Sequence, residues 1–547
     1  MPTHEVQNQV SPLVGYNLYG ADHVLREAVA REEASWVADR ALKLGEILGG
    51  EEAIQWGFDA NNYPPVLHTH DAQGNRIDEV RFHPAWHELM RLSVENGVHN
   101  LPWTAPRDGA HVGRAALMYL VGQNEAGHSC PISMTYAAVP SLKMQAELAA
   151  DWVPRIASMQ YDPRFLPADQ KQGVLIGMAM TEKQGGSDVR ANTSRGVAAG
   201  RGGPGSEYRL TGHKWFCSAP MCDAFLVLAQ APGGLSCFLL PRWTPEGKRN
   251  RFFIQRLKNK LGNRSNASSE IEFEDAFATL IGEEGRGVRT IVEMVNHTRL
   301  DCTLGSAALM RQTVVQAAHH ARHRSAFGKR LIDQPLMQNV LADLCIESEA
   351  ATVLALRLAR AYDSREESEA LFRRIATAVG KYWLCKRGAV HAGEALECLG
   401  GNGFVEDSMM PRLFRESPLN SIWEGSGNVI CLDVLRAIGN EPGTIEALWA
   451  EIDRARGADR RLDQAAGQLR DGWQALAADP TQARRLVERL ALVLQGSLIV
   501  RHSPPEVADA FCASRLAGDW GRAFGTLPGS VKFAAIIDRN TGDVTST

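Results

Sequence analysis

The sequence predicts an α+β protein made of four successive segments. Apolar residues recur at helical spacing in 1–172, in 283–439 and in an extension at 440–547. The segment 173–282 instead holds short apolar or alternating runs separated by Gly, Pro and Asn, which is typical of antiparallel strands. A chain of 547 residues is also longer than one hydrophobic core usually supports, so several domains are expected.

The individual elements follow from the same patterns. Between 21 and 48, apolar residues such as Val24, Val29 and Trp36 have the spacing of one long amphipathic helix. The Gly-rich stretch 196–207 predicts a hairpin loop, because so much glycine cannot sustain a helix or an interior strand. The extension contains further helical periodicity, and its last residues, 538–547, are expected to be disordered.

Composition restricts the class of protein. No apolar run approaches the length that spans a bilayer, so no membrane association is expected. The N-terminus lacks the basic and apolar regions of a signal peptide, which predicts a cytoplasmic location. The ten cysteines show neither a metal-binding nor a redox spacing, and we expect reduced, mostly buried thiols and no metal. A net charge of −4 gives no overall attraction to nucleic acid.

Two motifs in the β-rich segment could bind a flavin. In AMTEKQGGSDVRA (179–191), glycines permit close approach of a ligand, while Thr181 and Ser187 offer short donors to a ring edge or a phosphate. In LTGHKWFCSAP (210–220), the indole of Trp215 can cover a flavin face and Ser218 can donate toward its N5. An ordinary loop and an aromatic residue on the inner face of a strand are the alternatives.

Three motifs in the second helical segment could bind the rest of a dinucleotide or carry out chemistry. Arg324, in RHRSAFGKRLIDQP, can pair bidentately with a pyrophosphate, although a cation at a helix C-terminus is also a good dipole partner. Gly400 and Gly401, in ECLGGNGFVEDSMMPRLFRE, permit close approach to an adenine or a pyrophosphate, or simply end a helix. Glu424, next to Trp423, can act as a base, or be a surface residue in a turn.

Taken together and in this order, the motifs resemble the acyl-CoA dehydrogenase family. AMTEKQGGSDVRA is similar to the first signature of that family, GHKWFCS to its Trp-containing strand, and KNKLGNRSNASSEIEFEDAFA to the end of its β-domain. RSAFG is similar to its Arg-x-x-Phe-Gly turn, and ECLGGNGFVEDSMMPRLFRE to its second signature. The resemblance implies an N-terminal α-domain, a central β-domain and a C-terminal four-helix domain, with FAD between the last two, and a homotetramer.

The resemblance also implies roles for particular residues. The flavin would be contacted by Met180, Thr181, Gly186, Ser187, Trp215, Phe216 and Ser218. The ADP part of FAD would be reached from a neighbouring subunit by Arg324, Phe327, Gly400 and Gly401, while Trp423, Ser426 and Asn428 would flank the cofactor of their own subunit. Glu424 would remove the proton α to a thioester carbonyl while the β-hydrogen leaves as hydride to flavin N5. Arg299 matches a family arginine near the active site.

Some positions depart from the family pattern. Glu397 replaces the usual Gln, Cys217 the usual Thr or Ser, and Asn296 a common Asp. A nitroalkane-oxidase-like activity is a further alternative, but it would favour Asp where this chain has Glu424.

The chain most resembles family members associated with the bacterial response to alkylation damage. That likeness implies non-specific binding of double-stranded DNA and weak acyl-CoA dehydrogenase activity. Arginines of the extension could then form a stripe against phosphates, or a solvated helix face or subunit contact: Arg454, Arg456, Arg460, Arg461, Arg484, Arg485 and Arg489. The alternative function is a metabolic acyl-CoA dehydrogenase that uses Glu424 as its base.

Overall fold

The computed structural model describes residues 3–544, which form two compact units. We call them the sheet unit (Gln55–Pro106 and Glu125–Thr298) and the helical unit (Met1–Ile54, Arg107–Asn124 and Arg299–Thr547). Each unit combines parts of several predicted segments. The fold class is confirmed: a central β-domain stands between helical N-terminal and C-terminal parts of the chain.

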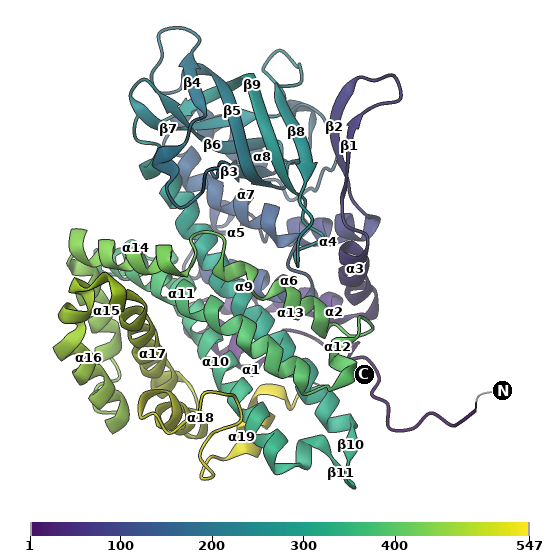
Figure 1. The fold of residues 1–547 in the computed structure, drawn as a ribbon, viewed down its shortest axis with the longest axis vertical. Coiled ribbons are helices and arrows are strands. Elements are labelled where there is room, and N and C mark those ends of the chain that lie inside the picture. The colour runs from purple at the N-terminus through teal and green to yellow at the C-terminus, as the bar shows by residue number, and fades with distance from the viewer. Residues whose placement is uncertain (1–2, 545–547) are drawn as a thin grey trace. The chain divides into compact units, whose positions relative to one another are not determined.

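The sheet unit is built on a seven-stranded sheet with the strand order β3-β6-β4-β5-β9-β7, in which β8 pairs with β9 (Figure 1). Its strands are β3 (Ile176–Ala179), β4 (Arg195–Ala198), β5 (Glu207–Ser218), β6 (Ala224–Ala231), β7 (Gly234–Pro241), β8 (Phe252–Leu257) and β9 (Ser268–Ile281). Most pairs are antiparallel, as expected, but β6 runs parallel to β3 and β4. The predicted Gly-rich hairpin is confirmed, since Ala198 of β4 pairs with Tyr208 of β5.

The helices of the sheet unit pack beside the sheet, with α7 against β3 (Figure 1). They are most of α3 (Glu51–Asn62), α4 (Pro84–Glu95), α5 (Leu101–Thr104), α7 (Ser129–Leu142), α8 (Ala146–Ile156) and the start of α9 (Gly287–His323). The expectation of helices alone before 172 missed the antiparallel hairpin of β1 (Val66–His70) and β2 (Arg76–Arg81). Asp71 closes its turn by accepting hydrogen bonds from the backbone of Gln73 and Asn75.

The helical unit is organised around the long helices α9, α10 and α11, whose mutual faces are almost entirely buried. Its other helices pack around these three. The helices that precede the extension are α1 (His23–Arg31), α2 (Ala38–Gly49), α6 (Ala110–Asn124), α10 (Pro335–Asp363), α11 (Glu367–Glu397), α12 (Gly401–Phe404), α13 (Met410–Glu416) and α14 (Gly427–Asn440). The short strands β10 (Ser325–Ala326) and β11 (Lys329–Arg330) form a hairpin after α9.

The single helix predicted for 21–48 is wrong, because the structure has two helices there, α1 and α2. Asp22 caps the start of α1 by accepting from the backbone N–H of Leu25 at 2.9 Å. Glu32 ends α1, and Glu33 has a φ of 64°, in the left-handed region that no α-helix contains. The apolar pattern continues across this break because each helix has its own buried apolar face.

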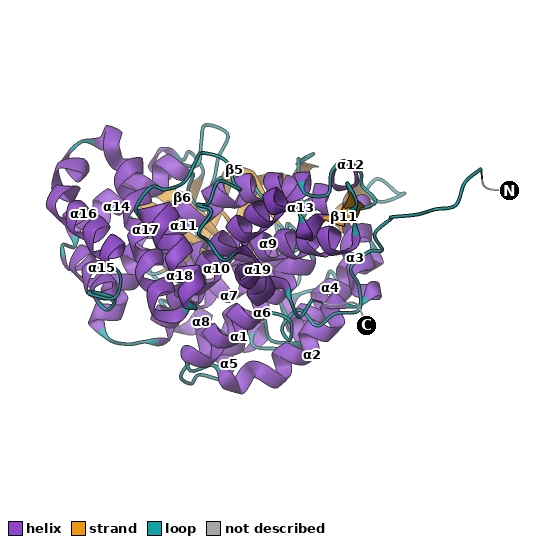
Figure 2. Ribbon diagram, turned by 90° about the horizontal axis from the view of Figure 1, so that it is seen from below, coloured by secondary structure: helices purple, strands orange, loops and turns teal. Residues whose placement is uncertain are grey.

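The extension is helical, as predicted, and Figure 2 shows α15 to α18 grouped beside α11 and α14. Its helices are α15 (Gly443–Asp453), α16 (Arg460–Ala478), α17 (Ala483–His502), α18 (Pro505–Phe511) and α19 (Phe533–Thr541). The expected disorder at 538–547 is contradicted up to residue 544: α19 continues to Thr541, and Val544 is buried. Arg539 explains part of this order, since it pairs with Glu27 and Glu349. Residues 545–547 lie outside the described part of the chain.

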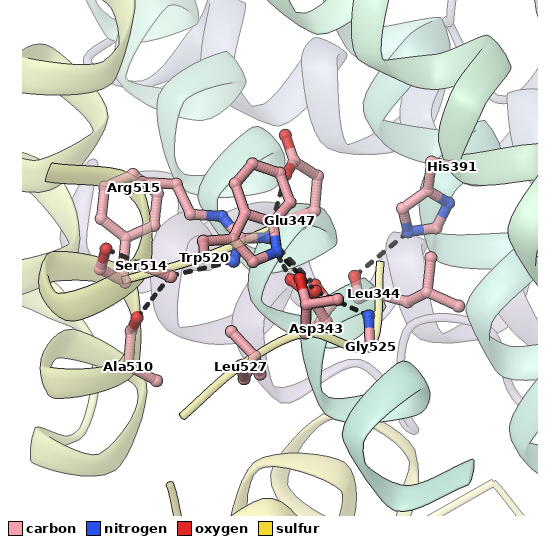
Figure 3. Close-up of polar contacts among 12 residues, drawn as sticks. Asp343, Leu344, Glu347, His391, Ala510, Ser514, Arg515, Trp520, Gly525 and Leu527 are labelled. Carbon is pink, nitrogen blue, oxygen red and sulfur yellow. Dashed lines mark hydrogen bonds and ion pairs between the residues drawn. The ribbon is translucent and has the colours of Figure 1, made fainter. Parts of the chain in front are cut away.

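A buried ionic cluster joins the extension to α10 (Figure 3). Arg515 pairs with Asp343 and Glu347, and the indole N–H of Trp520 donates to Asp343 at 2.9 Å. The backbone N–H of Gly525 donates to the same carboxylate at 2.9 Å. Asp343 is fully buried and Arg515 nearly so, which makes the extension part of the core of the helical unit.

All ten cysteines are buried with free thiols, as expected. Burial raises the pKa of several of these thiols, for example that of Cys237 to about 12. Within residues 3–544, no group of three or more His, Cys, Asp or Glu side chains is arranged to hold a metal ion. No helix in that range combines the length and the apolar character that crossing a bilayer requires.

Candidate functional site

The loop after β3 carries the first motif. The buried carboxylate of Glu182, within this motif, bonds backbone groups on the far side of the loop. Glu182 is fully buried and accepts hydrogen bonds from the backbone N–H groups of Thr193 at 2.7 Å and Ser194 at 3.1 Å. Lys214 pairs with Glu182 at 2.9 Å and also donates to the carbonyls of Met180 and Leu228. Burial lowers the pKa of Lys214 to about 8. Burial alone would raise the pKa of Glu182, but Lys214 and the hydrogen bonds hold it well below its usual range.

The predicted flavin-contacting residues of this loop are more exposed than the Glu182–Lys214 pair. Gly186 and Ser187 are exposed, and Thr181 is half-buried. A β-carbon at position 186 would collide with the Thr181 hydroxyl, so the loop requires glycine there. The backbone N–H of Trp215 donates to the carbonyl of Thr181 at 2.8 Å, which joins the loop to β5. The structure therefore brings the first two predicted motifs together, and it adds Glu182 and Lys214, which sequence reasoning had not selected.

The predicted aromatic pair lies on β5, where the register with β9 shifts between Lys214 and Cys217. Such an irregularity redirects side chains. Phe216 is 52% exposed and Trp215 is half-buried, whereas Cys217 is fully buried. The ammonium of Lys258 lies 3.6 Å from the centre of the Trp215 ring and 4.5 Å from that of Phe216.

Cations thus surround an accessible aromatic surface, since Lys183 and Arg256 also lie 5.7 Å from the centre of the Trp215 ring. The inner-face alternative for this tryptophan is not supported. Ser218, half-buried near the end of the same strand, is hydrogen-bonded to Ser268 at 3.2 Å.

A second predicted group lines a pocket in the helical unit. The pocket has a volume of about 320 Å³, and its walls come from the end of α9, the β10–β11 hairpin and the end of α11. It is lined by His320, Arg324, Ala326, Leu331, Glu397, Cys398, Leu399, Gly400, Gly401 and Asn402. A β-carbon at Gly400 or Gly401 would meet no atom within 4 Å, so open space lies over both glycines. Two motifs far apart in the sequence thus form one cavity.

The chemistry of this pocket suits a nucleotide. Arg324 offers a guanidinium to a phosphate, and burial lowers the pKa of His320 to about 4, so its imidazole is neutral at neutral pH. Glu397, the departure from the family pattern, also lines the wall. Phe327, at the tip of the hairpin, is 99% exposed.

The loop that carries Glu424 is held in an unusual backbone conformation. Glu424 has a φ of 57°, which is uncommon for a non-glycine residue, and Gly425 follows with a φ of 106°. Arg299 donates to the carbonyl of Glu424 at 3.0 Å, and Lys381 donates to the carbonyl of Gly425. Cations therefore fix two successive carbonyls of this loop.

The arginine is fixed in turn by Asp433, which accepts from Arg299 at 2.8 Å and from Arg374 at 2.9 Å. The two arginines hold the pKa of Asp433 below its usual range, against the effect of burial. Sequence reasoning identified Arg299 but missed Lys381, Arg374 and Asp433. No sequence motif marks these three residues. They lie on α11 and α14, and they come close to the Glu424 loop only when the chain is folded.

The neighbours of Glu424 have separate anchors. The indole N–H of Trp423 donates to Asn420 at 2.9 Å. Ser426 and Asn428 are exposed at the start of α14, and Asn428 accepts from Arg484 at 2.8 Å. Arg484, predicted to bind DNA, therefore contacts a residue predicted to bind the cofactor.

The arginines of the extension form two groups and not one stripe. Arg454, Arg456, Arg460 and Arg461 lie near the start of α16, while Arg484, Arg485 and Arg489 lie near the start of α17. The two helices pack together after a short connection at 479–482, so the groups occupy opposite ends of α16, roughly 27 Å apart along its axis.

Several of these arginines already have acidic partners. Arg454 pairs with Glu451, Arg456 with Asp453, and Arg461 with Asp459 and Asp509. Arg460, Arg485 and Arg489 are exposed and make no ion pair within residues 3–544.

Comparisons with known proteins identify the family. Residues 177–276 match the acyl-CoA dehydrogenase middle domain and residues 285–439 its C-terminal domain, while residues 8–163 match the adaptive response protein AidB N-terminal domain. The chain is 49% identical over 513 residues to the AidB protein of Escherichia coli (strain K12), which covers 93% of this chain and 94% of that protein. The chain belongs to the acyl-CoA dehydrogenase family. It is an AidB-like member of that family.

A further sequence match and a solved structure extend the comparison. Acyl-CoA dehydrogenase family member 11 of Caenorhabditis elegans is 30% identical over 489 residues, covering 85% of this chain and 76% of that protein. The crystal structure of C. elegans ACDH-11 in complex with C11-CoA superposes with a TM-score of 0.86 at 27% identity, covering 94% of this chain and 93% of that one. Members of the family are FAD-dependent oxidoreductases, so the expectations of FAD and of an oxidoreductase are confirmed.

Proposed function

We propose that this AidB-like protein combines weak dehydrogenation of acyl-CoA thioesters, with Glu424 as the base, and sequence-independent binding of double-stranded DNA in the response to alkylation damage. The observation that best supports the first activity is the conformation of the Glu424 loop. Left-handed φ values at non-glycine residues persist where the surroundings enforce them, and they concentrate at functional sites. Here Arg299 and Lys381 supply that enforcement.

The residues of the described chain fit FAD. In the helical unit, the pocket around Arg324, Gly400 and Gly401 would hold the adenosine and pyrophosphate of the FAD of a neighbouring subunit. In the sheet unit, the loop 181–187 with Trp215 and Phe216 would contact the flavin. When bound, FAD supplies an acceptor for the hydride that leaves the β-carbon of the thioester. Glu424 removes the α-proton as a general base, and the fixed loop limits the orientations of its carboxylate.

The test of the first activity is the variant Glu424→Gln, with Glu446→Gln, an exposed glutamate of α15, as the matched control. We expect Glu424→Gln to keep the flavin absorbance and to slow anaerobic bleaching by acyl-CoA about a thousandfold, within the range of a lost general base. The control should bleach at the rate of the unchanged protein. Equal rates for both variants would contradict the assignment of Glu424.

DNA binding is supported by the likeness to AidB and by the three unpaired arginines Arg460, Arg485 and Arg489. An arginine without an acidic partner can contact a phosphate without first breaking an ion pair. The two arginine groups, at opposite ends of α16, offer two separate phosphate contacts and no base-reading module, so we expect binding without sequence preference.

The DNA test is a mobility shift across a range of salt concentrations. Replacing Arg460, Arg485 and Arg489 together with Ala should weaken binding and reduce the slope of log K against log salt by about 3, if each contacts one phosphate. Replacing the paired Arg454 and Arg456 should have a smaller effect. Fast bleaching by an acyl-CoA, with no DNA retardation at low salt, would instead indicate a metabolic dehydrogenase.

A further inference from the structure

An N-terminal arm, residues 3–12, contacts the C-terminal end of α9 in the helical unit through Asn8 and Ser11. The side chain of His319 is hydrogen-bonded to the carbonyl of Ser11 at 2.9 Å, and Arg324 donates to the carbonyl of Asn8. Just beyond the arm, the buried Tyr16 hydroxyl donates to Gln312 at 3.0 Å. Residues 16, 11 and 8 thus contact residues 312, 319 and 324 in turn. The arm therefore runs antiparallel to α9, with its first residues nearest the C-terminal end of the helix.

The arm ends its contact with α9 in a reciprocal pair of hydrogen bonds. Asn8 donates through Nδ2 to the carbonyl of Ser325 at 2.8 Å, and its Oδ1 accepts from the backbone N–H of Ser325 at 2.8 Å. One side chain therefore satisfies both backbone groups of Ser325. Asn8 has a φ of 55°, a conformation that asparagine adopts more readily than most residues.

Ser325 is the first residue of the β10–β11 hairpin, which needs support at its base. Each of its strands has two residues, and a two-stranded hairpin is at best marginally stable by itself. Its tip places Phe327 at a φ of 53° and Gly328 at 77°. A left-handed phenylalanine is unfavourable, so the flanking residues must hold the turn closed.

The residues on either side of Ser325 also form one wall of the pocket described above. Arg324 and Ala326, on either side of Ser325, both line it. One guanidinium nitrogen of Arg324 donates to the arm, and its remaining N–H groups are available to a phosphate. The arm therefore fixes the direction of the side chain that would meet a pyrophosphate.

We propose that Asn8 and the N-terminal arm are positioning elements of the cofactor pocket, which hold Arg324 and the hairpin in the geometry that binds the ADP part of FAD. The proposal rests on FAD as the cofactor and on Arg324 as its ligand. It is independent of the base assignment and of DNA binding, so its test follows FAD affinity.

The main variant is Asn8→Gly, which accepts the left-handed φ and removes only the side chain. Titration of the apoprotein with FAD, followed by flavin fluorescence, should show a dissociation constant about tenfold higher than that of the unchanged protein, from the loss of two modest hydrogen bonds. Gln7→Gly is the matched control, since it makes the same exposed arm more flexible but keeps the hydrogen bonds between Asn8 and Ser325. It should bind FAD normally.

Further readouts separate positioning from a folding defect. Asn8→Gly should keep the melting temperature of the apoprotein and, when saturated with FAD, the bleaching rate. Asn8→Asp retains the acceptor for the Ser325 N–H, and its FAD affinity should be intermediate.

Arg324→Ala tests the premise. It should weaken FAD binding, and in the double variant the effect of Asn8→Gly should largely disappear, because Asn8 acts on FAD through the position of Arg324. FAD affinity within twofold of normal in Asn8→Gly would overturn the role of the arm. Normal affinity in Arg324→Ala would overturn the proposal at its premise. A fully additive double variant would also overturn it, since Asn8 would then act independently of Arg324.

Discussion

At the scale of single residues, the candidate active site depends on charges that bind backbone atoms. Arg299 and Lys381 hold the carbonyls of Glu424 and Gly425, while Asp433 holds Arg299. At the loop after β3, Glu182 accepts from the backbone N–H of Thr193 and Lys214 donates to the carbonyl of Met180. In both places a buried or half-buried ion pair holds a loop in its conformation. Substitution of one member of such a pair should therefore change the loop conformation more than the stability of the fold.

Arg299→Lys tests this in the base loop. Lysine has a single charged nitrogen and cannot bind the Glu424 carbonyl and Asp433 in the two directions that the guanidinium spans. We expect unchanged FAD content and acyl-CoA bleaching slowed about tenfold, as for a misplaced catalytic group. Arg365→Lys, on the exposed surface between α10 and α11, should bleach normally in the same stopped-flow measurement. Normal bleaching in Arg299→Lys would show that this arginine does not position the loop.

His391 should make the protein sensitive to acid. The residue is fully buried, and burial lowers its pKa to about 4 although its Nε2–H donates to the carbonyl of Leu344. An unfolded histidine has a pKa of about 6.5, so between pH 6.5 and 4 the unfolded chain binds a proton that the folded protein does not. Stability is complete above this window and falls as the pH falls through it.

At pH 5 this one residue lowers the free energy of unfolding by about 2 kcal/mol. Urea unfolding of the unchanged protein and of His391→Gln at pH 7.5 and pH 5 measures it. The variant should lose less stability between the two pH values. Identical losses would mean that His391 does not contribute to acid sensitivity.

At the scale of elements, the extension is fixed to the helical unit by the Arg515 cluster (Figure 3). Arg515→Met would leave Asp343 and Glu347 buried without this partner, and such a loss destabilises by about 3 to 5 kcal/mol. Lys532→Met breaks the exposed pair with Glu506 and should cost less than about 1 kcal/mol. Equilibrium unfolding monitored by tryptophan fluorescence compares them, and equal small effects would show that the cluster does not anchor the extension.

The sequence allowed the elements to be predicted where the pattern is local and regular. The strands β3, β5, β6, β7 and β9 and the long helices follow from the spacing of apolar residues, and the hairpin follows from its glycines, whereas β4 and β8 were not predicted. The break at Glu33 was missed because a single left-handed residue leaves the apolar spacing of 21–48 almost unchanged. The motifs proposed to bind ligands were found by their residue types and by resemblance, whereas the roles of Glu182 and Lys381 were not. Their roles depend on burial and on contacts with distant residues, which only the fold determines.

At the scale of the whole molecule, the helical unit exposes large apolar side chains. Phe327, Leu336 and Phe404 are each at least 80% exposed, and packing against another subunit would remove their apolar surface from water. The homotetramer implied by the family resemblance would cover them.

Light scattering coupled to size-exclusion chromatography tests the tetramer. The unchanged protein should elute as a tetramer, and the double variant Phe327→Ser with Leu336→Ser should shift to smaller species as protein concentration falls. Val197→Ser, at a position 65% exposed in the sheet unit, is the control and should not dissociate. A monomer at all concentrations for the unchanged protein would contradict the tetramer.

The burial of every cysteine gives this protein a set of intrinsic probes. A thiol reagent reacts with the thiolate at an accessible sulfur, and the folded protein offers neither, because each thiol is buried and burial raises the pKa of many of them. Labelling must therefore follow local or global opening. Cys130, Cys217, Cys222 and Cys237 report on the sheet unit and the other six on the helical unit. Peptide-resolved labelling rates would map the opening free energy across both units without an engineered residue.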